Sequence, residues 1–128
     1  MRVIHFTVGA GDPLWGTGAS GVDFVPMLTG DSAFQVGCLH LEKGAVADRL
    51  APEHSCALLV VQGTATLLDP DRIDLSGGMG IVVQRGENIR MESRGGAVLL
   101  IVESVGLEAT EVAISTPDRI SGQRWPGE

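Results

Sequence analysis

The sequence has few aromatic residues and no tyrosine, so ring packing cannot build its interior. Aromatic residues make up 4% of the 128-residue chain, whereas hydrophobic residues make up 44%. A chain of this length forms a single domain, residues 1–128, that buries its own core. The core must therefore be built from Val, Leu, Ile and Ala, a composition that suits β-strands.

Long apolar runs and clusters of basic residues are also missing. No run reaches the roughly 18 apolar residues that a spanning helix needs, and the N-terminus MRVIHFTVGAGD lacks the long apolar region of a signal peptide. The nine Lys and Arg residues are scattered, and a formal charge of -7 repels polyanions. We therefore expect a cytoplasmic protein that binds neither nucleic acid nor membranes. Its two cysteines, Cys38 and Cys56, are expected to stay reduced there.

Glycine and proline are abundant, and they divide the chain into short apolar runs. The 18 Gly and 6 Pro leave no run as long as a typical helix, and several runs alternate apolar with polar residues. Many short strands between turns predict an all-β sandwich or barrel. The expected strands are residues 3–8, 22–28, 34–41, 56–62, 64–68, 80–84, 88–93, 97–104 and 110–115. We expect residues 1–34 to form an N-terminal strand arm and residues 115–128 an irregular tail, either a lid or arm or simply a surface loop and a frayed end.

Two stretches framed by glycines, residues 44–63 and 78–93, resemble the two sequence motifs of the cupins. The first cupin motif runs Gly, five residues, His-x-His, three or four residues, Glu, six residues, Gly, and it matches without insertion from Gly44 to Gly63. The second runs Gly, five residues, Pro-x-Gly, two residues, His, three residues, Asn, and it matches through Gly78 and Gly86. The resemblance implies one cupin domain with the double-stranded β-helix fold, the jelly-roll barrel of that family.

The residues that bind metal in cupins are absent from this frame. The four ligand positions, three His and one Glu in the family, are occupied here by Leu50, Pro52, Cys56 and Ile89. Leu, Pro and Ile donate no lone pair, and a single thiolate cannot hold a divalent ion. We therefore expect no bound metal and no cofactor.

The three histidines do not restore such a site, because His5, His40 and His54 fall in different segments of the chain. Alternation along residues 34–41 places His40 on the same strand face as Cys38, outside the barrel pocket, where it is expected to be a structural histidine. His54 and Cys56 are two residues apart and so share a strand face, which makes a Cys/His nucleophile pair conceivable. No orienting third group or oxyanion donor can be named, so we favour a small buried thiol.

The expected pocket is the apolar interior of the barrel. Alternation from Cys56 and from Ile89 turns Leu58 and Met91 inward as well. The expected ligand-binding lining is Leu50, Pro52, His54, Cys56, Leu58, Ile89 and Met91. No convergent acid/base pair is found on inward positions, so the sequence favours binding over catalysis.

Three functions remain open at this stage. The favoured one is a metal-free protein that binds a small, partly apolar metabolite in the barrel. The alternatives are a metal-independent isomerase, epimerase or lyase, and a structural dimer module with a filled barrel. We also expect a homodimer, because small cupins resemble one another in pairing through a sheet face and exchanged terminal strands, and apolar segments precede the motifs here.

Overall fold

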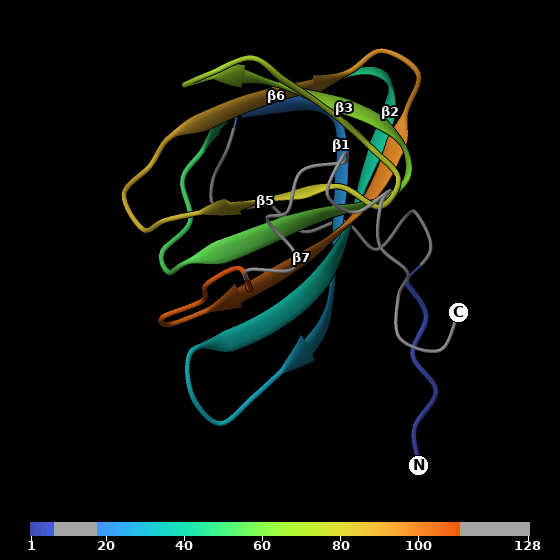
Figure 1. Cartoon of the computed structure of the whole chain (residues 1–128). Helices are drawn as coiled ribbons and strands as arrows, with labels where there is room; N and C mark the ends of the chain where they lie inside the picture. Colours follow the sequence, from blue (N-terminus) through green and yellow to red (C-terminus); the bar gives the residue numbers. More distant parts are fainter. Residues whose placement is uncertain (7–17, 111–128) are drawn as a thin grey trace, which may run out of the picture.

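The computed structural model describes residues 1–6 and 18–110, and within them the chain forms seven β-strands and no helix (Figure 1). In this part of the chain there is accordingly no helix long and apolar enough to cross a membrane. The all-β prediction is confirmed. The strands are β1 (Gly18–Thr29), β2 (Phe34–Leu50), β3 (Cys56–Asp69), β4 (Ile73–Ser76), β5 (Gly80–Val83), β6 (Ile89–Ser93) and β7 (Ala97–Ser104).

Two long strands, β2 and β3, each take part in both layers of the barrel (Figure 1). β1 pairs along both parts of β2, whereas on its other edge the first part of β2 pairs with β7 and the last part with β6. The first part of β3 pairs with β5 and β7, and its last part pairs with β4 and β6. All of these pairs are antiparallel, so one layer is centred on β7 and the other on β6.

The change of layer within β3 happens at Gly63, and only glycine fits there. Its φ is +81°, and a Cβ atom at this position would collide with the carbonyl oxygen of Gly96. All four glycines of the two cupin-like motifs have positive φ, namely Gly44, Gly63, Gly78 and Gly86. The motif frame therefore coincides with turns and bends of the backbone.

The core is aliphatic, as the composition predicts. Along β7 burial alternates strictly, so that every second residue from Ala97 faces the interior and the residues between them face outward. Phe24 is the one aromatic residue in the core cluster. Its other members are Leu39, Leu41, Ala45, Ala47, Cys56, Leu58, Val60, Ala65, Leu67, Leu75, Val83, Ile89, Met91, Ala97, Leu99 and Ile101.

The strand boundaries differ from the expected ones in several places, and β4 (Ile73–Ser76) was not expected as a strand. Residues 44–50 continue β2, and the two expected strands at 56–62 and 64–68 form the single strand β3. Residues 3–6 are not in a strand, and β1, which lies within the expected N-terminal strand arm, pairs with β2. Residues 7–8, residues 111–115 of the expected last strand, and the tail at 115–128 lie outside the described residues.

Candidate functional site

Four residues of the expected barrel lining lie together in the core. Cys56, Leu58 and Met91 are 0% exposed and Ile89 is 3% exposed, and all four belong to one cluster. Cys56 and Leu58 lie on the first part of β3, in the β7-centred layer, whereas Ile89 and Met91 lie on β6 in the other layer. The two pairs thus belong to different layers of one core.

The other three residues of that lining lie at or before the start of β3. Pro52 is buried and His54 is half-buried in the loop of residues 51–55. The backbone of Leu50 is the register partner of Ile89, whereas its side chain lies outside the described part of the structure. The backbones of these two motif positions are therefore direct neighbours on adjacent strands, β2 and β6.

A buried carboxylate, Glu103, lies at this end of the barrel, and the sequence analysis missed it. Glu103 on β7 is the register partner of Cys56 on β3 and of Gln35 on β2. It is 8% exposed and shares the inward face of β7 with Leu99 and Ile101. Glu103 is thus a single inward acid that lies outside the lining expected from the sequence.

One oxygen of this carboxylate has no partner. Within the described residues, Oε2 of Glu103 is the one buried side-chain nitrogen or oxygen without a hydrogen bond. Leaving a buried acceptor unpaired costs about 1 to 3 kcal/mol, and more when the group is charged. Such a group calls for an explanation, because nearly all buried polar atoms in folded proteins are paired.

The Cys56 thiol is held in its neutral form. Burial raises its pKa, and the nearby negative charge of Glu103 raises it further, to about 12. No hydrogen bond joins Cys56 to His54 among the residues that the structure describes. At neutral pH Cys56 is therefore neither an activated nucleophile nor a ready metal ligand.

The residues at this end of the barrel do not fit the metal that cupins commonly bind. Cys56 supplies a thiol with a strongly raised pKa, Glu103 supplies a carboxylate, and His54 lies in the adjacent loop, whereas Pro52 and Ile89 supply no donor. Across residues 1–6 and 18–110 no group of three or more His, Cys, Asp and Glu side chains is arranged to hold a metal ion. Catalytic zinc sites, by comparison, use three such protein ligands.

Hydrogen bonds tie the surrounding loops together at the same end. The hydroxyl of Ser55 donates to Oε1 of Gln84 at 3.1 Å, which links the loop before β3 to the turn after β5. The backbone N–H of Ser104, next to Glu103, donates to the carbonyl of Ser55 at 2.9 Å. Oε1 of Glu87 accepts from the N–H of Gln84 at 2.7 Å and closes that turn. These contacts hold the loops beside the ends of β3 and β7.

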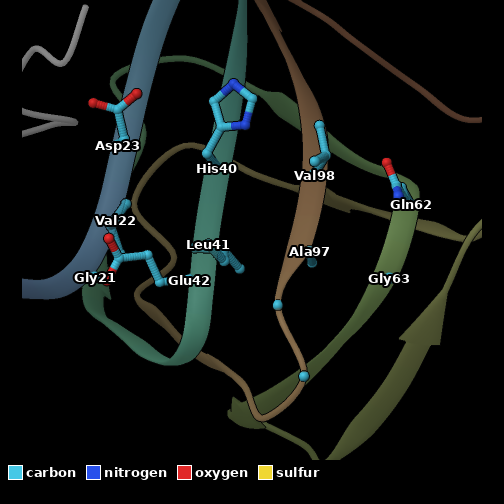
Figure 2. A pocket seen from close by; sticks show the side chains of 12 residues that line it. Gly21, Val22, Asp23, His40, Leu41, Glu42, Gln62, Gly63, Ala97 and Val98 are labelled. Carbon is cyan, nitrogen blue, oxygen red and sulfur yellow. The ribbon is translucent and has the colours of Figure 1, made fainter. Parts of the chain in front are cut away.

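A separate cavity of about 680 Å³ lies on the outer face of the β7-centred layer (Figure 2). A row of outward side chains crosses it on four neighbouring strands, because Asp23, His40, Val98 and Gln62 are register partners in turn. The sequence analysis did not find this cavity, since its residues become neighbours only through strand pairing. Its lining is completed by Gly21, Val22, Leu41, Glu42, Gly63, Gly95, Gly96 and Ala97.

His40 in this cavity is a hydrogen-bonded histidine on the outside of the barrel. Its Nε2 lies 2.8 Å from the carbonyl oxygen of Phe6, which can only accept, so the ring nitrogen donates. The same Nε2 lies 3.5 Å from Sγ of Cys38, on the strand face that alternation predicts. Burial, followed by the charge of Asp23, raises the pKa of the Cys38 thiol. Because Nε2 already carries the donated proton, it cannot act as a base towards Cys38 in this arrangement.

Comparison with known proteins gives structural matches only. No protein-family model matches the sequence, and no curated protein matches it either. The polyketide cyclase RemF of Streptomyces resistomycificus superimposes with a TM-score of 0.64 at 19% identity, over 80% of this chain and 78% of that chain.

Two cupins of known structure match in the same way. An RmlC-like cupin of Shewanella frigidimarina gives a TM-score of 0.60 at 20% identity, over 83% of this chain and 95% of that one. A cupin superfamily protein of Desulfitobacterium hafniense gives 0.60 at 18% identity, over 66% and 77% of the two chains. Likeness at this level of identity reports architecture, and together with the motif glycines at their turns it shows that this chain has the cupin fold.

Proposed function

We propose that this chain is a metal-free binding protein of cupin fold, which takes a small, partly apolar ligand at the end of the barrel where Cys56 and Glu103 face inward. The observation that carries the proposal is the buried, unpartnered Oε2 of Glu103. A ligand that donates a hydrogen bond to this oxygen would remove the cost of leaving it unpaired.

The composition of this end of the barrel supports the proposal. Ligand sites are usually concave and mostly apolar, with a few placed polar groups that fix orientation. Here Leu58, Ile101 and Met91 provide apolar surface, and Glu103 provides one strong acceptor. The loops joined through Ser55 and Gln84 lie at the same end, where a ligand would enter.

A metal-independent isomerase, epimerase or lyase is the second candidate. It is favoured by Glu103 lying opposite Cys56, because a carboxylate beside a thiol is the inward acid/base pair that such chemistry requires. The matched structure of RemF belongs to a polyketide cyclase, so the fold is compatible with catalysis. The raised pKa of Cys56 argues for the binding function, because a thiol with a pKa of about 12 is a poor acid at neutral pH.

A structural module with a filled barrel remains the third candidate, since Cys56, Leu58 and Met91 are fully buried. Methyl NMR of Leu58 and Met91 distinguishes the three. A library of small metabolites is expected to shift these two inward signals and to leave those of Leu59 and Val61, on the outer face of the same strand, unchanged. A library in which no compound shifts Leu58 or Met91 would leave the filled module as the answer. Conversion of the bound compound would establish the enzyme.

We also propose a cytoplasmic location. Cys38 and Cys56 are both unbonded thiols, and they lie on opposite faces of the β7-centred layer, so they cannot pair with each other. Reduced, buried cysteines are usual in that compartment. Fractionation of the source cells with an antibody to the chain tests this.

A further inference from the structure

We infer that the ligand of the barrel carries a positively charged amine, which the carboxylate of Glu103 binds. This inference rests on the proposed binding function and names the chemical class of its ligand. It is argued from the charge, the position and the surroundings of Glu103.

The negative charge of Glu103 has no counter-charge in the described residues. The three ion pairs found there use other carboxylates and are all partly solvent-exposed: Arg72 with Asp74, Arg90 with Asp48, and Arg94 with Glu92. The register neighbours of Glu103 are also uncharged, since Gln35 lies on one side of it and Cys56 on the other.

Burial of a lone carboxylate is costly unless a cation or several hydrogen bonds compensate it. If Glu103 bound nothing, its replacement by an amide or apolar side chain of similar size would raise the free energy of unfolding of the barrel. A cationic ligand compensates the charge and also supplies a donor to Oε2, so one group satisfies both requirements.

A neutral donor such as an alcohol would compensate the Glu103 carboxylate less well than an ammonium ion. An alcohol can donate to the carboxylate oxygen, but it leaves the negative charge uncompensated, whereas an ammonium ion adds direct attraction between opposite charges. The formal charge of -7 also attracts cations to the protein over a longer range than any single contact. Glu103 also lies directly opposite Cys56 in the register of β7 and β3, so an ammonium group bound to it would sit at the inward position of β3.

The residues next to Glu103 define the rest of the ligand. One register step further into the barrel, Ile101 on β7 pairs with Leu58 on β3 and with Gly37 on β2. These neighbours offer no polar side chain, so the body attached to the amine must be apolar. We therefore expect a small alkyl or similarly apolar amine, with its ammonium group at Glu103 and its apolar part towards Leu58 and Ile101. These two side chains are 0% and 2% exposed, so they must shift to admit the ligand.

The test compares two probes of nearly equal shape, n-butylammonium and 1-butanol, in NMR titrations read at the signals of Leu58 and Met91. Wild-type protein is expected to bind the ammonium ion about tenfold more tightly than the alcohol. Glu103→Gln, which keeps the shape and removes the charge, is expected to abolish this preference. Glu53→Gln is the matched control, because Glu53 is an exposed carboxylate in the loop at the same end of the barrel, and it should leave the preference unchanged.

Each result decides between the two proposals. Equal binding of both probes by the wild type, or a preference that survives in Glu103→Gln, overturns the amine and leaves the barrel as a binding site. Failure of both probes and of the metabolite library to shift Leu58 or Met91 overturns the binding function itself. Glu103→Asp retains the carboxylate and should retain part of the preference, which guards against a loss caused by misfolding of Glu103→Gln.

Discussion

Replacement of Cys56 by Glu tests how the barrel tolerates charge at the position where cupins carry a metal ligand. Cys56 is fully buried and directly opposite Glu103 in the antiparallel register of β3 and β7. The variant therefore places two carboxylates on facing inward positions, where side chains in such pairs are about 5 Å apart. It cannot complete a metal site, so we expect it to destabilise the fold.

The size of the effect follows from the geometry. Two unit charges about 5 Å apart repel by roughly 3 kcal/mol at an effective dielectric constant of about 20. Forcing the longer side chain into a packed interior adds about 1 to 3 kcal/mol. Protonation of one carboxyl group limits the total, because two such groups share a proton when they cannot both ionise. We expect a loss of about 3 to 5 kcal/mol, a large part of the stability of a domain this size.

Urea unfolding followed by circular dichroism at pH 7 measures this loss. Gln62→Glu is the control, because Gln62 lies on the same strand but is exposed, and its change should stay within about 0.5 kcal/mol. The double variant Cys56→Glu with Glu103→Gln should recover about 1 to 3 kcal/mol, since the repulsion is then gone. An equal loss in both backgrounds would show that the two side chains do not face each other, and a variant as stable as the parent would refute the whole reasoning.

Three further predictions concern protonation, metal and assembly. The pKa of Cys56 is about 12 in the folded protein against an ordinary 9.0, so as the pH rises the thiol loses its proton in the unfolded state before it does in the folded state. The free energy of unfolding is therefore unaffected by this group below about pH 9. Above about pH 9 the free energy of unfolding should fall by about 1.4 kcal/mol per pH unit. In Cys56→Ala only the smaller pH dependence due to Cys38 should remain, and urea unfolding at several pH values measures both. Elemental analysis after chelation and dialysis should find far less than one equivalent of Zn, Fe, Mn or Ni, and a value near one would contradict our interpretation of the ligand positions. Light scattering at tens of micromolar should report a homodimer, because Leu28, Leu59 and Val61 expose apolar surface on the outer face of the β7-centred layer. Leu59→Lys should weaken that dimer. A monomeric wild-type protein would refute the prediction.

The fold could be predicted from the sequence because the glycines of both cupin-like motifs are present although the metal-binding residues of those motifs are not. Gly44, Gly63, Gly78 and Gly86 occupy backbone positions with positive φ, which other residues rarely adopt. Their spacing fixed the register of β3 and β6 and so turned Cys56 inward. The aliphatic composition predicted the core in the same way, since no other residues were available to fill it.

Glu103 could not be predicted by the same reasoning. It lies on β7, beyond both motifs, where only alternation could assign its face. Alternation is silent there, because the outward positions Val98, Leu100 and Val102 are as apolar as the inward ones. A strand that is apolar on both faces gives no period-two signal, and its single carboxylate is most simply taken for the solvated end of a strand. Only the pairing of Glu103 with Cys56 shows that it faces the interior.

The sharing of β2 and β3 between the two layers limits how the barrel can move. Each layer contains part of both strands, so neither layer can separate from the other without breaking the covalent continuity of its own strands or the ladders beside them. A clamshell opening of the two layers would therefore cost many ladder hydrogen bonds, whereas a loop movement would cost few. Among the described residues, the contact between Ser55 and Gln84 joins two loops at the Glu103 end, so a guest molecule entering there would have to break it.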